Sequence, residues 1–226
     1  MAKPISIAID GPAGAGKSTI ARRLAKELGF YYVDTGAIYR TVAYFFDLWG
    51  VSPKDIDGIT RYIDELTIGI EYDDEGVQHM IMNGMDVTGD IRTPDLSQKA
   101  SLVSAHAIVR DLLLDMQREM AEKHNVIMDG RDIGTVVFPD AELKLFMTAD
   151  TAVRACRRYK ELTGKGMSVT MEEVERNIRE RDKADMSRAV SPLRQADDAI
   201  VLDNSHMSVD EQMAWFMNEF QLKMKN

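Results

Sequence analysis

The sequence has one cysteine, Cys156, among its 226 residues. An intrachain disulfide and a cysteine-ligated zinc cluster are therefore both excluded. Long apolar runs are missing as well. None approaches the roughly 20 residues that a membrane-spanning helix needs, and the amino terminus lacks the apolar stretch of a secretion signal. These absences lead us to expect a cytoplasmic protein without a membrane anchor.

Basic residues are fewer than acidic residues in this sequence. Lys and Arg total 28 against 37 Asp and Glu, and the formal net charge is −9 at pH 7. Such a balance argues against general binding of nucleic acids or anionic membranes, so we expect neither partner. The basic residues are unevenly placed, however, because 11 of the 28 lie between Arg154 and Arg194. This segment is either a solvated helix face, which composition alone favours, or a site for one anionic ligand.

The length and apolar content allow one substantial domain with a proper core, since 45% of the 226 residues are hydrophobic. Residues 5–10 alternate like a buried strand, and residues 20–28 form an amphipathic helix. The loop between them fits the phosphate-binding pattern G-x-x-x-x-G-K-[ST]. A lone glycine-rich turn is often only a turn, but the strand–loop–helix context favours a loop whose N–H groups and helix dipole hold a polyphosphate.

We therefore assign nine loop residues to binding of a nucleoside triphosphate: Gly11, Pro12, Ala13, Gly14, Ala15, Gly16, Lys17, Ser18 and Thr19. Lys17 would bridge the outer phosphates, and the Ser18 hydroxyl would ligate Mg²⁺. Asp129 closes another apolar strand, residues 126–129, and is the expected partner for the metal or its waters. The alternative is that Asp129 only caps the turn that follows.

Two polar runs follow predicted strands. Asp34-Thr35-Gly36 ends a strand over residues 30–34 and precedes a helix over 37–49 that carries Arg40, and Gly130-Arg131-Asp132 follows Asp129. The carboxyl ends of parallel strands meet at one edge of an open sheet, where ligands bind. Further core strands are expected over 143–147 and 199–203. An exposed arginine without a ligand is the alternative for Arg40.

The middle of the chain interrupts the alternation of strands and helices. A helix is expected over 52–66, followed by an antiparallel meander over 67–72, 77–82 and 85–87 with a turn at Asn83-Gly84. We interpret this part as an insertion. Two helices, over 94–103 and 107–123, then contribute Ser101 and Arg110.

Arginines gather on two further helices. The first begins at Asp150-Thr151 and carries Arg154, Arg157 and Arg158, and Gly164 and Gly166 interrupt it. Thr170 and Glu173 form a capping box for the second, on which Arg181, Asp185 and Arg188 share one face if the helix extends that far. Two arginine-bearing helices around a flexible glycine pair predict a lid that closes over phosphates. The alternative is a charged surface hairpin.

The phosphate loop alone is shared by ATPases, GTPases and small-molecule kinases. No N-K-x-D run is present to read guanine, and ATPase motors are normally longer. A kinase in which two phosphate-bearing ligands meet remains, and four runs resemble bacterial cytidylate kinases over essentially the whole chain. The runs are residues 11–19, 34–40 (Asp-Thr-Gly-Ala-Ile-Tyr-Arg), 129–135 (Asp-Gly-Arg-Asp-Ile-Gly-Thr) and 179–182 (Arg-Glu-Arg-Asp).

The resemblance implies an α/β P-loop kinase fold of three layers, with a parallel central sheet, an acceptor-binding insertion containing a small antiparallel sheet, and a helical lid. It implies a single domain over 1–226. The core would comprise about 1–34, 124–153 and 171–226, and the acceptor region about 35–123 with the insertion at 52–92. The lid would span about 154–170. We expect a monomer.

The resemblance also implies ATP- and Mg²⁺-dependent phosphorylation of CMP and dCMP by direct in-line transfer. Ser101, Arg110 and Asp132 resemble the residues that read cytosine. Arg40, Arg131 and Arg188 resemble the cradle of the acceptor phosphate, and Arg181 and Asp185 resemble the sugar contacts. Thr35 and Gly36 complete the acceptor site. The residues expected to act on the transferred group are Lys17, Arg131, Arg154, Arg158 and Arg188, with Ser18 and, through water, Asp129 for the metal.

Other functions share parts of this pattern. Another nucleoside monophosphate kinase, or a kinase of the shikimate or gluconate type, would have the same loop with different acceptor contacts. A regulatory module that binds ATP without turnover would be expected to lose the loop lysine or the lid arginines, and this chain has both.

Replacing Lys17 by Ala tests the phosphate loop. We expect turnover to fall by orders of magnitude with the fold intact, because the charge that bridges the outer phosphates is lost. Steady-state phosphoryl transfer and circular dichroism would check this, and near-wild-type activity would refute the assignment of the loop.

Overall fold

The computed structural model describes residues 3–225. Its centre is a five-stranded sheet in the order β2-β6-β1-β7-β8, and every neighbouring pair is parallel. The strands are β1 (Ser6–Asp10), β2 (Tyr31–Asp34), β6 (Val126–Gly130), β7 (Leu143–Thr148) and β8 (Ile200–Asp203). The order places β1 in the middle of the sheet, so the loop that follows it emerges at the centre of the carboxyl edge.

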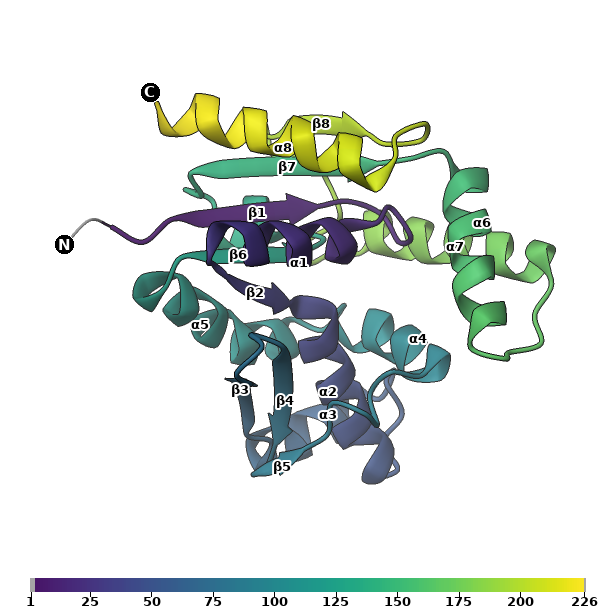
Figure 1. The fold of residues 1–226 in the computed structure, drawn as a ribbon. Helices are drawn as coiled ribbons and strands as arrows, with labels where there is room; N and C mark the ends of the chain where they lie inside the picture. Colours follow the sequence, from purple (N-terminus) through teal and green to yellow (C-terminus); the bar gives the residue numbers. More distant parts are fainter. Residues whose placement is uncertain (1–2, 226) are drawn as a thin grey trace.

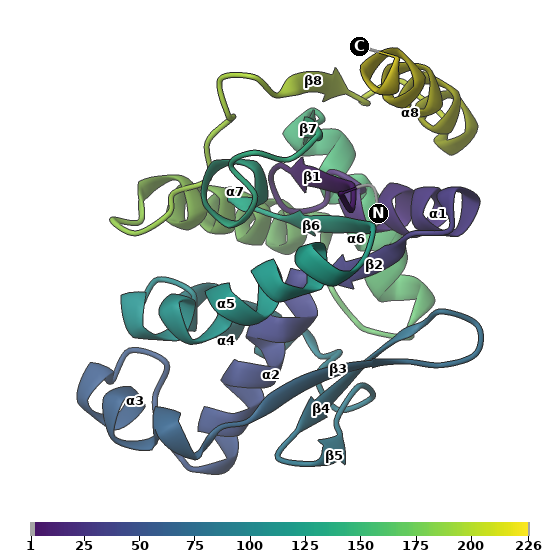
Figure 2. The same cartoon turned by 90° about the vertical axis from the view of Figure 1, so that its left-hand side faces the viewer.

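Helices cover both faces of this sheet. α1 (Lys17–Leu28) and α8 (Val209–Met224) pack on one face, and α2 (Thr35–Leu48) and α5 (Ala107–Lys123) pack on the other (Figure 2). Successive residues of β1 belong to opposite cores. Ile7 and Ile9 are part of the cluster under α1 and α8, whereas Ala8 is part of the cluster under α2 and α5. This alternation is the period of two that a strand imposes. The predicted three-layer α/β fold is confirmed.

The insertion lies below the sheet in Figure 1 and includes a second, antiparallel sheet in the order β3-β4-β5. Its elements are α3 (Ile56–Tyr62), a 3₁₀ turn (Ile63–Glu65), β3 (Ile68–Tyr72), β4 (Gln78–Met82) and β5 (Met85–Asp86), and α4 (Pro94–Val103) follows it. The Tyr72 hydroxyl donates to the carbonyl of Tyr32 at 2.9 Å, which ties the small sheet to the edge of the large one.

The two arginine-bearing helices form a hairpin at the carboxyl edge, toward which the strand arrows point in Figure 1. They are α6 (Thr151–Gly164) and α7 (Met171–Ser187), and the predicted capping box of Thr170 and Glu173 begins α7. Four buried residues, Ala155, Leu162, Val174 and Ile178, give the hairpin an apolar cluster separate from the two main cores. Within residues 3–225 no helix has the length and apolar character that a membrane crossing requires.

Several expected elements needed correction. The helix expected over 52–66 begins only at Ile56, because Asp55 caps it by accepting from the N–H of Gly58 at 3.0 Å, and its last turn is 3₁₀. The helix expected from residue 37 begins at Thr35, since Asp34 is its N-cap. A five-residue turn of π type, Ile133–Val137, was not predicted at all. Arg188 lies just beyond the end of α7 as its C-cap, so the helix ends before it.

Phe216 tests the packing of α8. Its side chain is 0% exposed in the cluster that joins α8 to the sheet, so we expect Phe216→Ala to lower the free energy of unfolding by about 3–5 kcal/mol. Leu48→Ala is the control, because Leu48 is 60% exposed and its truncation should cost less than about 0.5 kcal/mol. Urea unfolding of both variants makes the comparison, and equal losses would contradict the assigned core.

Candidate active site

The phosphate loop leaves the centre of the sheet between β1 and α1. Gly11 has φ 147°, and a Cβ atom there would lie 2.0 Å from the carbonyl oxygen of Met147 on β7, so only glycine fits. Asn204, after β8, supports the loop from behind by donating from Nδ2 to the carbonyl of Ala15 at 2.8 Å. The loop is therefore constrained by Met147 on β7 and by Asn204, which follows β8.

The Lys17 side chain folds back over its own loop. Its ammonium group donates to the carbonyls of Gly11 and Pro12 at 2.7 and 2.9 Å. Burial and then the nearby charge of Arg131 lower the pKa of Lys17 to about 7. The ammonium group is thus poorly compensated where it lies, and an anion beside it would favour its charged form.

Ser18 and Asp129 meet as predicted at the carboxyl edge. The Ser18 hydroxyl donates to Asp129 Oδ2 at 2.9 Å, and the Tyr32 hydroxyl donates to Oδ1 at 2.7 Å. Burial raises the pKa of the Asp129 carboxyl. No group of three or more acidic or histidine ligands for a metal occurs in residues 3–225. Two protein oxygens nevertheless suit Mg²⁺, which usually keeps waters and binds through phosphates with only one or two side chains.

The residues expected to read a base lie between the insertion and the sheet. Arg110 forms a buried ion pair with Asp132 through Oδ2 and also donates to the carbonyl of Ser104 at 3.1 Å. The other oxygen of Asp132 has Arg188 Nη2 at 3.6 Å, beyond hydrogen-bond distance. Ser101 is directed elsewhere, since its hydroxyl donates to Asp185 Oδ1 at 3.0 Å. Arg110 and Asp132 therefore adjoin, and Ser101 instead contacts Asp185, which was expected at the sugar.

Buried cationic nitrogens without a partner distinguish this region. Among the described residues, Arg40 Nε, Arg181 Nε and Arg188 Nη2 are buried and donate no hydrogen bond. Arg131, in contrast, donates from Nε to Asp185 Oδ2 at 2.8 Å. Burial and then the charge of Arg131 lower the pKa of Arg181 to about 10. Buried polar groups are normally satisfied, so these nitrogens indicate a place for an anion.

Arg154 and Arg158, both on α6, differ in their surroundings. Arg154 is buried against the phosphate loop, where it donates to the Ala13 carbonyl at 3.0 Å and pairs with Asp182 at 2.6 Å. Arg158 pairs with Glu161 of its own helix at 2.7 Å and contributes to the region only through its charge, which acts on Arg181. The structure therefore places Arg154 with the loop and leaves Arg158 on the hairpin surface.

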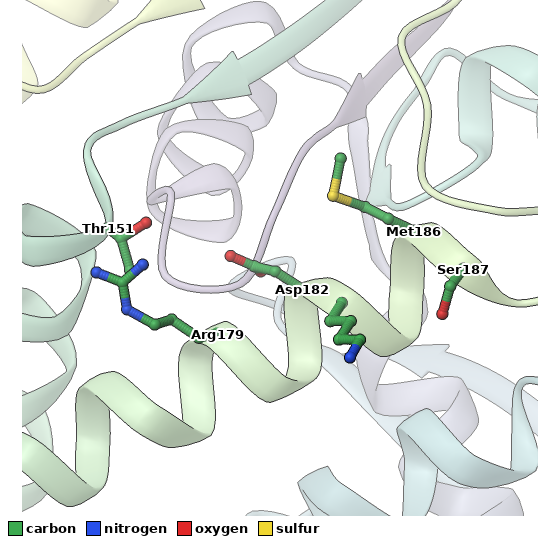
Figure 3. Close-up of a pocket in the computed structure, with 6 residues that line it drawn as sticks. Thr151, Arg179, Asp182, Met186 and Ser187 are labelled. Carbon is green, nitrogen blue, oxygen red and sulfur yellow. The ribbon is translucent and has the colours of Figure 1, made fainter.

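Asp182 was not singled out from the sequence, although it closes the run Arg179-Glu180-Arg181-Asp182. Its carboxylate accepts from the Ala13 N–H at 3.3 Å, and Figure 3 shows it directed toward the phosphate loop. It also borders a pocket of about 490 Å³. The other lining residues are Thr151, Arg179, Lys183, Met186 and Ser187. Asp182 thus links α7 to both Arg154 and the loop.

The remaining predicted residues lie at the start of α2. Arg40 donates to Asp34 Oδ2 at 3.2 Å, and the Thr35 hydroxyl donates to the carbonyl of Asp129 at 2.7 Å. A Cβ atom at Gly36 would come within 3.1 Å of the Arg40 guanidinium, so glycine leaves that group room. The strand-end runs are therefore adjacent, as their positions after parallel strands predicted.

A parallel sheet with a phosphate loop at its centre, a buried lysine on that loop and an arginine-rich helical hairpin beside it define the P-loop kinase class. A family model for cytidylate kinase matches residues 7–222. A cytidylate kinase of Bacteroides fragilis is 46% identical over 227 residues, with 99% of each chain covered, and one of Carboxydothermus hydrogenoformans is 50% identical over 208 residues, with 92% and 93% covered. The chain belongs to the cytidylate kinase family.

A solved structure of an uncharacterised protein from Eubacterium ventriosum is similar with a TM-score of 0.51 and 13% identity. That likeness covers 96% of this chain and 98% of the other. At this identity it supports the fold alone.

Gly11 tests the geometry of the loop. Gly11→Ala places a methyl group against the Met147 carbonyl, so we expect a loss of about 2–4 kcal/mol in unfolding free energy and loss of ATP binding. Gly164→Ala is the matched control, because no atom lies within 4 Å of the added methyl. Denaturant unfolding and calorimetric titration with ATP would measure both effects. Wild-type affinity in Gly11→Ala would show that the loop tolerates a side chain there.

Proposed function

We propose that this chain transfers the γ-phosphoryl group of ATP directly to the phosphate of CMP or dCMP. The carrying observation is the set of buried nitrogens of Arg40, Arg181 and Arg188 that donate no hydrogen bond. One loop accommodates one polyphosphate, and the additional cationic nitrogens suit a second phosphate-bearing ligand. Family membership supports CMP as that ligand.

Asp132 and Arg110 suit a cytosine ring. Arg110 occupies Oδ2 of Asp132, which leaves Oδ1 available to accept from the exocyclic amine of cytosine. The guanidinium of Arg110, once shared with the ligand, can donate to the acceptor atoms of the ring, as can Ser101 after leaving Asp185. Uracil has a carbonyl in place of the amine and would face the carboxylate with a second acceptor. This arrangement therefore favours CMP over UMP.

The acceptor phosphate would lie among Arg40, Arg131 and Arg188, and the sugar beside Arg181 and Asp185. The ion pair between Arg131 and Asp185 supports this division, because Asp185 holds the Arg131 side chain while leaving part of its guanidinium to bind phosphate. Asp185 can accept from either sugar hydroxyl, so a 2′-hydroxyl is not required. The acceptor phosphate is already an oxyanion near neutral pH, and no general base is needed.

On the donor side, the nine loop residues would surround the ATP phosphates. Lys17 would leave the carbonyls of Gly11 and Pro12 for the outer phosphates, which would compensate its buried charge. Ser18, and Asp129 through water, would hold Mg²⁺. When bound with ATP, the ion would neutralise developing charge on the phosphate oxygens.

The helical hairpin would act as a lid, with Arg154 and Arg158 meeting the transferred group. Phosphoryl transfer requires alignment, charge neutralisation and exclusion of water, and closing arginines supply the last two. We retain the proposed division into core (about 1–34, 124–153, 171–226), acceptor region (35–123) and lid (154–170). The apolar contacts between Val174 or Ile178 and α6 join the start of α7 to the lid.

We further propose that the protein is cytoplasmic and monomeric. The monomer is supported by α8, which buries its apolar side on the chain's own sheet.

The test is diphosphate formation from ATP and Mg²⁺ with CMP, dCMP, UMP, AMP, GMP and shikimate as acceptors. Strong turnover of CMP and dCMP alone supports the proposal, and chelation of Mg²⁺ should abolish it. Turnover of a different acceptor alone would retain the kinase and reject the base contacts. Silence across the panel with ATP still bound would favour a regulatory module.

Asp132→Ala in the same panel tests the base contact. We expect kcat/KM for CMP to fall roughly 10- to 100-fold more than for UMP, because a charged hydrogen bond to the amine is lost. Asp140→Ala, an exposed aspartate remote from the base contacts, is the control and should leave both values unchanged. Equal losses on both nucleotides would remove the base-reading role from Asp132.

A further inference from the structure

Asp10 is a buried carboxylate that the proposed mechanism does not use. It is the last residue of β1, and it is 4% exposed. Its two oxygens accept from two successive backbone N–H groups, Oδ1 from Ile133 at 2.8 Å and Oδ2 from Gly134 at 2.7 Å. These N–H groups begin the short helical turn Ile133–Val137. Asp10 therefore caps this turn from another part of the chain.

The residue that would ordinarily cap the turn is Asp132. An aspartate at the N-cap position usually accepts from the first N–H groups of its own helix, as Asp34 does for α2. Asp132 occupies the N-cap position of the π turn, yet its side chain makes no capping bond. Its carboxylate instead pairs with Arg110. Asp10 therefore makes the capping hydrogen bonds that Asp132 would otherwise make.

We propose that Asp10 is a positioning residue for base recognition: it caps the turn in place of Asp132 and so keeps the Asp132 carboxylate directed at the base. This inference rests on the proposed function, because it assigns Asp132 to the base. Asp10 itself touches no ligand in this arrangement.

The surroundings of Asp10 support a dedicated cap. Each of the two N–H groups has an oxygen of its own, which a carboxylate supplies and a carboxamide, with NH₂ in place of one oxygen, does not. Gly134 permits the close approach, since a Cβ atom there would lie 3.4 Å from Asp10 Oδ2 and 3.2 Å from Lys144 Cδ. Burial raises the pKa of Asp10 to about 7, and the two backbone hydrogen bonds from Gly134 and Ile133 oppose that rise by favouring the charged form.

Asp10→Asn is the direct test. It keeps the shape of the side chain and replaces one acceptor by a donor, which repels one of the two N–H groups and leaves Asp132 to cap its own turn. We expect the preference for CMP over UMP in kcat/KM to fall about tenfold, with KM for CMP rising and the dissociation constant for ATP unchanged within about twofold. Asp10 also adjoins the phosphate loop, so a general structural role would weaken ATP binding and both acceptors alike; that outcome would overturn the proposal.

The matched control is Glu142→Gln, because Glu142 also accepts from a backbone N–H distant in sequence, that of Ser6 at 2.8 Å, but does so at the amino end of β1. Its preference for CMP should be that of the wild type. The double variant Asp10→Asn/Asp132→Ala tests whether Asp10 acts through Asp132. If Asp10 acts through Asp132, then Asp10→Asn should lower the CMP:UMP ratio no further in that background, and a further fall of similar size would contradict the proposal.

Should Asp10→Asn fail to fold, Asp10→Ser decides the matter, since it introduces no opposing amide donor and leaves one short hydroxyl in place of the two oxygens that cap Ile133 and Gly134. A wild-type CMP:UMP ratio in a folded Asp10→Ser enzyme would overturn the inference, and a lowered ratio with unchanged ATP binding would support it. Lack of CMP turnover in the wild type would instead mark failure of the proposed function. A wild-type preference for CMP that survives Asp10→Asn would refute the role of Asp10 alone.

Discussion

Buried positive charge in excess of its partners is the constraint on which this structure depends. Each of three carboxylates holds one guanidinium near the phosphate loop: Asp132 holds Arg110, Asp185 holds Arg131 and Asp182 holds Arg154. Other buried arginines keep nitrogens without a partner. The carboxylates hold the arginines in place before a ligand arrives, which reduces the reorganisation that binding requires. The unmatched nitrogens then make anions, rather than neutral molecules, the favoured occupants.

Much of this arrangement was predictable, because the signals were local. The bounds of α4 and α5 were predicted without error, and the predicted capping box at Thr170 begins α7. The phosphate loop and the two strand-end runs are contiguous, and parallel strands bring such runs together at one edge. Two other elements did not match the expectation. The helix expected from residue 52 begins four residues later, at Ile56, with Asp55 as its N-cap. No periodic pattern in the sequence indicates the turn at Ile133–Val137.

The contacts of individual site residues were less predictable than their presence in the site. Asp182 and Asp10 each act on backbone N–H groups more than 120 residues away in sequence, at Ala13, Ile133 and Gly134. Backbone donors leave no mark in the sequence, so no motif could have identified these pairings. The same holds for Ser101, because the family resemblance placed it in the site but its hydroxyl donates to Asp185. A sequence pattern thus locates side chains at an edge, and packing determines their partners.

The central position of β1 also bears on how the chain is made. Its neighbours are β6 and β7, which pair Ser6 with Val126 and Ile7 with Leu143. During synthesis the first strand therefore emerges well before either strand that flanks it, and the Asn204 side chain that supports Ala15 emerges later still. Pairings this distant in sequence slow folding and leave apolar strands exposed on the nascent chain. The phosphate loop, although it lies early in the sequence, can therefore reach its final form only after Asn204 has been synthesised.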